Sequence, residues 1–314
     1  MKNKKIKIIF ILVTMLHIKN ALYAQFDPLL TQYMFNELYI NPAYAGSKEA
    51  LSIALFDRAQ WTGFDGAPNT STFNFHAPLA ENKMGIGISM MHDRIGVSNR
   101  GAVFASYAYR LPLATGQFSF GLQAGLTSTN EKLSQLNPNR ADDIEFAANT
   151  PSTMAPNFGF GLYYYTSKFY AGLSIPRMVQ NKINFGSGEI LLKENKIEIE
   201  NFHYFLATGY VFDLSDNVKL KPQMMVRVVK NAPAQMDFNL NALLVEKLWI
   251  GAGYRTNSDF NALVGFQFTP QLLATYSYDY SLTALQNYNS GSHELGLNYL
   301  FSFNKKKIVT TRYF

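Results

Sequence analysis

The sequence predicts an all-β protein: a transmembrane, antiparallel outer-membrane β-barrel of about 14 strands, preceded by an N-terminal signal peptide. Segments of about ten residues alternate apolar and polar side chains along most of the chain. Short turns and long loops alternate between these segments, as they do at the two ends of an outer-membrane barrel. Only 16% of residues are charged, while Phe and Tyr number 25 and 19, which suits strands that face lipid.

The first 24 residues predict a secretory signal peptide rather than a membrane anchor. Four lysines lie among the first seven residues, an apolar core follows at 8–16, and small residues precede a cleavage site after Ala24. The core has about nine residues, too few to span a bilayer as a helix. This leader carries five lysines and no acid, so its removal lowers the net charge from +6 to about +1. A basic nucleic-acid-binding surface is therefore not predicted.

The chain contains no cysteine, which excludes disulfides, thiolate zinc sites and cysteine nucleophiles. It also excludes the lipidated N-terminal cysteine of a bacterial lipoprotein. After the leader we expect a periplasmic or lumen segment at 25–48, the barrel at 49–303 and a C-terminal tail at 304–314.

Period-two alternation marks the individual strands. Between 118 and 126, for example, Phe and Leu alternate with Ser, Gly and Gln. The polar face is rich in Gly, Ser, Asn and Gln and poor in Lys and Glu, which favours a filled barrel interior over the solvated face of a soluble sandwich. The predicted strands lie near 50–60, 70–78, 84–92, 100–112, 117–128, 157–165, 168–176, 203–213, 217–230, 234–245, 247–256, 259–269, 271–281 and 292–303.

The first strand fits this pattern least well. Leu51, Leu55 and Trp61 share the apolar face, but Asp57 falls on the same face. A carboxylate is costly in lipid, so we expect either that the strand ends before Asp57 or that a bulge turns this residue away.

No catalytic set is predicted, so the chain is not expected to be an enzyme. His92 and Asp93 at a strand end could pair as a base and its orienting carboxylate, but nothing places a serine beside them. Carboxylates in the long loop, Asp142, Asp143 and Glu145, could bind calcium, although a solvated loop explains them as well. No metal-ligand spacing is present, and no cofactor or small-molecule substrate is predicted.

One stretch is not explained by periodicity. Asn41-Pro42 enforces a turn and Gly46 permits a positive φ, while Arg58 and Gln60 fall on the lumen-facing parity of the first strand. There they could hydrogen-bond an N-terminal segment folded into the barrel; Trp61 falls on the lipid-facing parity near the opposite rim. This motif either plugs the barrel or binds a partner, and its residues are Asn41, Pro42, Tyr44, Gly46, Arg58, Gln60, Trp61, Gly66 and Pro68.

These residues, with Gln32-Tyr33-Met34-Phe35-Asn36 before them and Gly63-x-x-Gly66-Ala67-Pro68 after them, resemble the PorP/SprF family of type IX secretion membrane proteins of Bacteroidota. The resemblance implies an outer-membrane barrel that assists export or surface attachment of cargo such as gliding adhesins. It implies secretion-machinery proteins, secreted cargo and outer-membrane lipid as partners. A passive porin, a barrel hydrolase and a soluble exported sandwich remain the alternatives.

Overall fold

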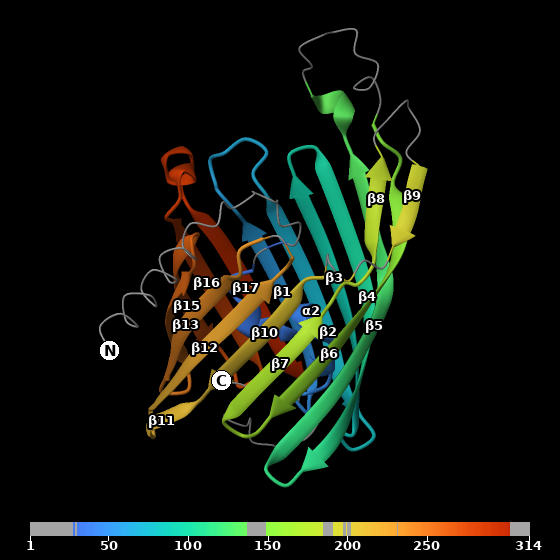
Figure 1. The fold of residues 1–314 in the computed structure, drawn as a ribbon. Coiled ribbons are helices and arrows are strands. Elements are labelled where there is room, and N and C mark those ends of the chain that lie inside the picture. Colours follow the sequence, from blue (N-terminus) through green and yellow to red (C-terminus); the bar gives the residue numbers. More distant parts are fainter. Residues whose placement is uncertain are drawn as a thin grey trace, which may run out of the picture.

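A computed structural model describes residues 28, 30–136, 149–184, 191–196, 199, 202–230 and 232–301. The signal peptide expected at 1–24, the tail expected at 304–314 and the carboxylates Asp142, Asp143 and Glu145 lie outside them. The described chain is an antiparallel β-barrel (Figure 1). No helix among the described residues is long and apolar enough to cross a membrane.

Fourteen strands form the wall within the described part of the chain, which confirms the predicted fold. β1 pairs with β17, and β10 pairs with both β7 and β12, so the sheet closes on itself. The wall strands are β1 (Leu51–Ala59), β2 (Asn69–Leu79), β3 (Met84–Ile95), β4 (Ser98–Leu113), β5 (Gly116–Glu131), β6 (Thr153–Tyr165), β7 (Phe169–Ile175), β10 (Tyr204–Tyr210), β12 (Val218–Val228), β13 (Gln235–Leu244), β14 (Leu248–Arg255), β15 (Asp259–Gln267), β16 (Leu272–Ser281) and β17 (Ser292–Phe301).

Three further strands were not predicted as separate elements. β11 (Phe212–Ser215) continues β10 beyond Val211 and pairs with β12. β8 (Gln180–Asn184) and β9 (Leu191–Lys196) form a hairpin inside the segment expected to be a long loop. The sequence there lacks a long alternating run, so periodicity gave no signal for the hairpin.

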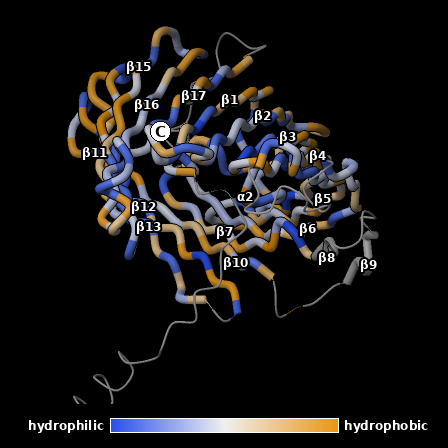
Figure 2. Tube along the Cα trace, turned by 90° about the horizontal axis from the view of Figure 1, so that it is seen from above, coloured by the Kyte–Doolittle hydropathy of each residue, from blue (hydrophilic) through white to orange (hydrophobic). Residues whose placement is uncertain are grey.

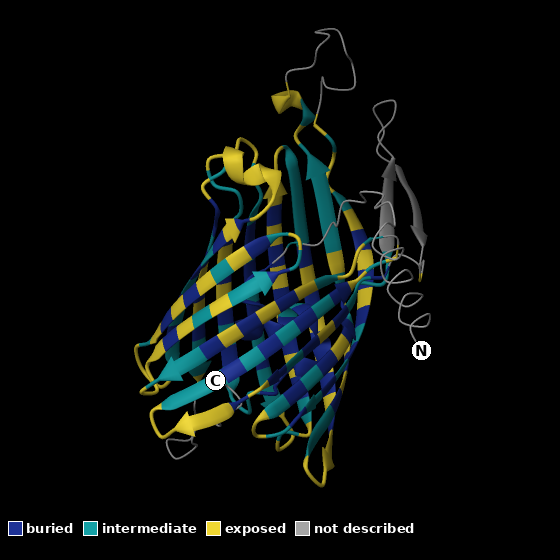
Figure 3. Cartoon of the chain, turned by 60° about the vertical axis from the view of Figure 1, so that its left-hand side comes forward, coloured by how far each residue is buried: buried dark blue, intermediate teal, exposed yellow. Residues whose placement is uncertain are grey.

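Side chains alternate between the lumen and the outside along the wall, as Figure 3 shows by the bands of buried and exposed residues. Leu55, Leu122 and Leu295 are exposed on the outer face, while Ser52, Ser119 and Glu294 are buried on the inner face. The view from above, coloured by hydropathy, shows the same alternation around the ring (Figure 2). The chain thus places apolar residues outward and polar residues inward, the inverse of a soluble sandwich.

The two ends of the barrel differ in their connections. At one end, tight turns join successive strands, and non-glycine residues with positive φ shape two of them, at 80–82 and at Val245–Glu246. The other end carries the longer loops. β1 begins and β17 ends at the short-turn end, as an even number of strands requires.

Asp57 corrects one expectation about the first strand. β1 neither ends before this residue nor bulges around it: it continues to Ala59 in unbroken register with β2 and β17. Asp57 therefore points outward with Leu55, and its Oδ2 accepts a hydrogen bond of 2.6 Å from Ser71 Oγ on β2. The expectation that the strand ends before Asp57 or bulges there was therefore wrong, and the Ser71 hydroxyl partners the carboxylate within the strand.

The chain before β1 folds into three short helical turns, η1 (Tyr33–Phe35), α2 (Glu37–Ile40) and η2 (Pro42–Tyr44). Asn41 caps η2, because its Oδ1 accepts a 2.9 Å hydrogen bond from the N–H of Ala43 while Pro42 occupies the first helical position. Figure 2 shows α2 within the ring of strands. Two other turns, η3 (Leu133–Gln135) and η6 (Ala284–Tyr288), lie in the long loops.

Candidate functional site

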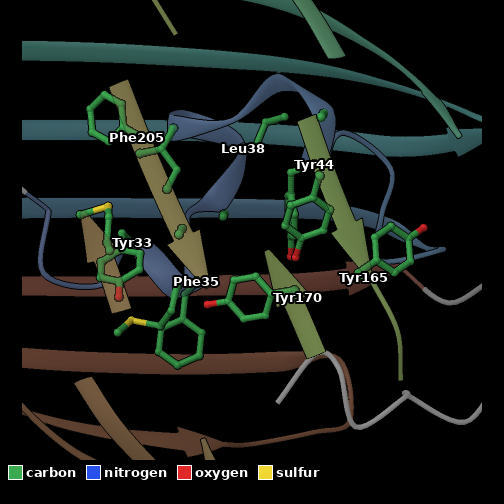
Figure 4. Packing of buried hydrophobic residues seen from close by; sticks show 14 of the residues in the cluster. Tyr33, Phe35, Leu38, Tyr44, Tyr165, Tyr170 and Phe205 are labelled. Carbon is green, nitrogen blue, oxygen red and sulfur yellow. The ribbon is translucent and has the colours of Figure 1, made fainter. Parts of the chain in front are cut away.

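Residues 30–47 lie inside the barrel, and we call this segment the plug. All eighteen are buried except Tyr39, which is partly buried. The plug runs from the long-loop ends of β1 and β14–β17, where Leu30 to Gln32 lie, to the short-turn end, where Gly46 precedes β1. Figure 4 shows how Tyr33, Phe35, Leu38 and Tyr44 pack against side chains of the wall.

Arg58 and two carboxylates of the wall hold the first residues of the plug. Arg58 lies 2.6 Å from Asp279 Oδ2 and 3.1 Å from Glu294 Oε2, and all three side chains are at most 2% exposed. Thr31 donates its hydroxyl to Asp279 at 2.6 Å, and the Thr31 and Gln32 N–H groups donate to Glu294 at 2.8 and 3.0 Å. Both carboxylates thus bind the Arg58 guanidinium and the plug at once, Glu294 through backbone N–H groups and Asp279 through the Thr31 hydroxyl, which compensates the cost of burying them.

A second buried cation binds the plug from the neighbouring strands. Arg255 at the end of β14 lies 2.7 Å from Asp237 and 3.5 Å from Asp259. The same guanidinium donates a 3.3 Å hydrogen bond to the carbonyl of Leu30. The backbone at the start of the plug is therefore fixed by both arginine clusters.

The middle of the plug packs against the wall through aromatic and amide groups. Phe35 meets Trp249 edge to face with ring centroids 5.1 Å apart. Asn36 donates a 3.0 Å hydrogen bond to Thr72 Oγ1 and accepts one from Asn74. These contacts satisfy the amide of Asn36 on both sides, as a buried amide requires.

The Asn41–Gly46 turn packs against β5 and β6 at positions where these strands carry glycine. A Cβ on Gly161 would overlap Asn41 Oδ1, and a Cβ on Gly121 would overlap the backbone of Pro42 and Ala43. Glycine on β5 and β6 thus lets the plug approach the wall backbone. Asn41 Nδ2 also donates a 3.0 Å hydrogen bond to the carbonyl of Leu162.

The end of the plug is held by Tyr44, Gly46 and Arg110. The Tyr44 ring lies 5.4 Å from both His76 and Tyr163 in edge-to-face contacts. Gly46 has φ of 70° and donates its N–H to His76 Nδ1 at 3.1 Å. Arg110 donates to the Ala45 carbonyl and to Asn82 and Met84 carbonyls at 2.7 and 2.9 Å, so it ties the plug to a tight turn of the wall.

The structure separates the nine motif residues into two groups. Five are buried in the lumen: Asn41, Pro42, Tyr44 and Gly46 belong to the plug, and Arg58 is a wall residue that binds the start of the plug at Thr31. The other four lie in the β1–β2 loop at the long-loop end: Gln60, Trp61, Gly66 and Pro68.

That loop is fastened to its neighbours by backbone groups. Gln60 N–H donates to the Pro68 carbonyl at 2.9 Å, and Gly96 N–H donates to the Gly66 carbonyl at 2.8 Å. Trp61 has a positive φ of 51° and its N–H donates to Ser292 Oγ at 3.1 Å. Trp61 has left the strand, so strand parity does not define its direction.

Sequence reasoning missed the wall residues that hold the plug. Asp279, Glu294, Arg255 and Arg110 sit at buried, inward positions of strands. Their signal was present: a charged residue at the lumen parity of a strand is expensive to bury alone and therefore indicates a partner inside the barrel. Which partner each one takes depends on register, which the sequence does not give.

Two cavities beside the plug are too small for a solute. They have volumes of about 10 and 20 Å3, and Tyr39, Pro176 and Arg177 line both. A volume of 10–15 Å3 admits a single water molecule. Residues 176–179 also fold against the inner wall, since Asn157 Oδ1 accepts the N–H groups of Met178 and Val179 at 3.0 and 3.1 Å.

His92 and Asp93 point to opposite faces of the wall. His92 is exposed outside, whereas Asp93 is buried and its Oδ1 accepts the Thr70 hydroxyl at 2.6 Å. The two residues therefore do not form the base and orienting carboxylate of a hydrolytic triad. Among the described residues, no group of His, Asp and Glu is placed to hold a metal ion.

The fold and the filled lumen define a class: a transmembrane β-barrel of the outer-membrane type with its own N-terminal segment inside. The family model of the type IX secretion system membrane protein PorP/SprF matches residues 22–299. The chain belongs to this family, and its place is the outer membrane. No curated protein matches the chain.

Several solved structures are similar to the chain at low sequence identity. The CymD monoaromatic hydrocarbon channel is similar with a TM-score of 0.51 and 12% identity, over 90% of this chain and 95% of that one. The P. putida toluene transporter TodX gives a TM-score of 0.49 and 10% identity, over 86% and 95% of the two chains. The Acinetobacter baumannii outer membrane protein Omp33 gives a TM-score of 0.43 and 11% identity, over 82% of this chain and 100% of that one.

Proposed function

We propose that this type IX secretion membrane protein assists export or surface attachment of cargo by protein–protein contact, and that it does not conduct solutes. The observation that carries the proposal is the plug, which fills the lumen and is bonded to the wall on many strands. A lumen occupied by its own chain leaves the surfaces of the barrel as the places where other proteins can bind. Machinery proteins and secreted cargo are the partners expected at those surfaces.

The contacts of the plug support a permanent rather than an easily displaced segment. Arg58 and Arg255 bind its first residues, and Arg110 and His76 bind its last ones. Removing the plug would break the hydrogen bonds that Asp279, Glu294, Thr72 and Asn74 of the wall make with it. Opening a pore would therefore require many plug-to-wall hydrogen bonds and packing contacts to break together.

The test combines purification with a transport assay. Tagged protein is extracted with detergent from outer membranes of cells that carry a type IX system, and bound proteins are identified by mass spectrometry. We expect machinery subunits or cargo to co-purify with the wild type. If neither machinery subunits nor cargo appear in repeated purifications, the proposal that the protein acts by protein–protein contact is wrong.

Liposome swelling tests the passive channel as the rival function. We expect liposomes with the purified protein to swell no faster than empty ones in sugar solutions. Sugar flux through the wild-type barrel would instead support a porin.

A further inference from the structure

A short part of the connection between β7 and β10 lies inside the barrel, and we call residues 176–179 the strap. β7 ends at Ile175, opposite Phe160, whereas β6 continues beyond this pair in register with β5. Pro176 has no N–H to offer a strand ladder, and Gly159 beside it has no Cβ that would overlap the Pro176 carbonyl. The chain therefore leaves the wall at Pro176 and turns into the lumen before it enters β8.

The wall holds the strap by its backbone. Asn157 Oδ1 accepts the N–H groups of Met178 and Val179 at 3.0 and 3.1 Å, and Asn157 Nδ2 donates to the Val179 carbonyl at 2.8 Å. Gln123 Nε2 donates to the Pro176 carbonyl at 2.6 Å, and the backbone of β6 adds a bond of 2.9 Å to the N–H of Met178. These wall groups are neutral, and two amide side chains supply most of them.

The strap contacts the middle of the plug. Arg177 donates a 3.4 Å hydrogen bond to the Tyr39 hydroxyl, and its guanidinium carbon lies 6.0 Å from the centroid of the Tyr39 ring. Just before the strap, Ser174 Oγ on β7 donates to the Ile40 carbonyl at 2.6 Å. The middle of the plug is therefore bound to the β7–β10 connection, whereas its two ends are bound to other parts of the wall.

An apolar cluster on the inner wall lies beside these contacts. Its buried members face the lumen from β3 and β4, and Tyr39 packs against them: Met91, Ala102 and Phe104. The cavity of about 10 Å3 at this place is lined by the cluster, by Tyr39 and by Pro176 and Arg177 of the strap. The strap thus covers apolar side chains that water would otherwise reach from the lumen.

We propose that the strap is a lid on the middle of the plug, which opens toward the long-loop end while both ends of the plug stay docked. The strap is held by neutral groups, whereas Arg58, Arg255 and Arg110 hold the ends of the plug. Hydrogen bonds from a charged group are roughly twice as strong as neutral ones, so the strap is the first of these attachments to release.

The lid also connects the lumen to the outer loops. The strap leads directly into β8, so a movement of the β8–β9 hairpin reaches Tyr39 through the backbone and Arg177. This device goes beyond the proposed function, and it does not depend on cargo binding.

Thiol labelling of the purified barrel tests the lid. The chain has no cysteine, so Met91→Cys places a single thiol beneath the strap. Asn157→Leu keeps the branched shape of the side chain and removes its three hydrogen bonds to the strap. We expect a bulky maleimide to label the thiol about tenfold faster in this variant. In the matched control Asn241→Leu, which alters a buried amide that donates to Gln223 of the wall, the rate should not change.

A second thiol position shows whether the end of the plug stays docked. Ser47→Cys reports on the short-turn end, and its labelling rate should be the same with and without Asn157→Leu. The heat-modifiable gel shift shows whether each barrel is folded. Gly159→Ala covers the case in which Asn157→Leu does not fold, because the added Cβ would overlap the Pro176 carbonyl and displace the strap.

Three results would overturn the proposal. Unchanged labelling of Met91→Cys in the folded strap variants would mean that the strap does not cover this space. An equal rise with Asn241→Leu would mean that any lost amide loosens the lumen. A rise at Ser47→Cys as large as that at Met91→Cys would mean that the plug opens as a whole, without a separate lid.

Discussion

The guanidinium of Arg58 lies 2.6 Å from the carboxylate of Asp279, with both side chains almost fully buried. These residues are more than two hundred positions apart in the chain, and the pair joins β1 to β16 across β17. Because Thr31 Oγ1 contacts both partners, at 3.0 Å from Arg58 and 2.6 Å from Asp279, the pair is also the attachment of the plug.

Arg58→Met should destabilise the barrel and loosen the start of the plug. The variant leaves Asp279 and Glu294 buried without their cation, which costs about 3–5 kcal/mol. Urea unfolding of the purified barrel, followed by its heat-modifiable gel shift, measures the loss. The control is Arg94→Met, an exposed arginine on β3, which should change stability by less than about 0.5 kcal/mol. Equal losses of stability in the two variants would contradict the role of Arg58 as the attachment of the plug.

Gly121→Ala should displace the Asn41–Gly46 turn. The added Cβ would overlap the backbone of Pro42 and Ala43, which cannot rotate away as a side chain can. Since the chain has no cysteine, Ser47→Cys provides a single buried thiol for a bulky maleimide. We expect labelling to rise about tenfold, the effect of 1.4 kcal/mol on local opening. Ala124→Val, which faces outward on the same strand, should leave the rate unchanged.

Trp249 reports whether the plug is docked. The chain has two tryptophans, so Trp61→Phe leaves the buried Trp249 as the single emitter beside Phe35. In that background Phe35→Ala removes an edge-to-face contact worth about 0.5–1.5 kcal/mol beyond its burial. We expect the emission to shift to longer wavelength as water reaches the indole. An unchanged spectrum would mean that Phe35 does not shield Trp249.

Lys48, which joins the plug to β1, should make stability rise in alkaline solution. Burial lowers the pKa of Lys48 to about 8, from an ordinary value of 10.5. Between these values the unfolded chain binds the proton and the folded protein does not, so folding becomes more favourable as pH rises. The test compares the urea unfolding midpoints of Lys48→Met and the wild type at pH 7.5 and 9.5. We expect the variant to be more stable at pH 7.5 and the difference in midpoint to be smaller at pH 9.5. An equal difference in urea midpoint at both pH values would contradict the lowered pKa of Lys48.

The strands could be predicted because apolar residues, which face outward, alternate with polar residues, which face the lumen, along each of them. Even the irregular Asp57 was visible in the sequence, although its partner Ser71 on β2 was not. The motif at 41–46 could be recognised as a turn, but its fit depends on Gly121 and Gly161, which look like ordinary strand glycines until register aligns them. Arg58 was expected to bind an inserted segment, whereas Asp279 and Glu294 emerge only from closure of the barrel.

The conductance of the purified protein in a planar lipid bilayer tests the central claim most directly. We expect the full chain to give no steady channels, and a variant lacking residues 30–47 to give steady ion conductance through an emptied lumen. The double variant Arg58→Met, Gly121→Ala covers the case in which the deletion does not fold, and it should conduct intermittently. Steady conductance of the full chain, equal to that of the deletion variant, would contradict a barrel closed by its own N-terminal segment.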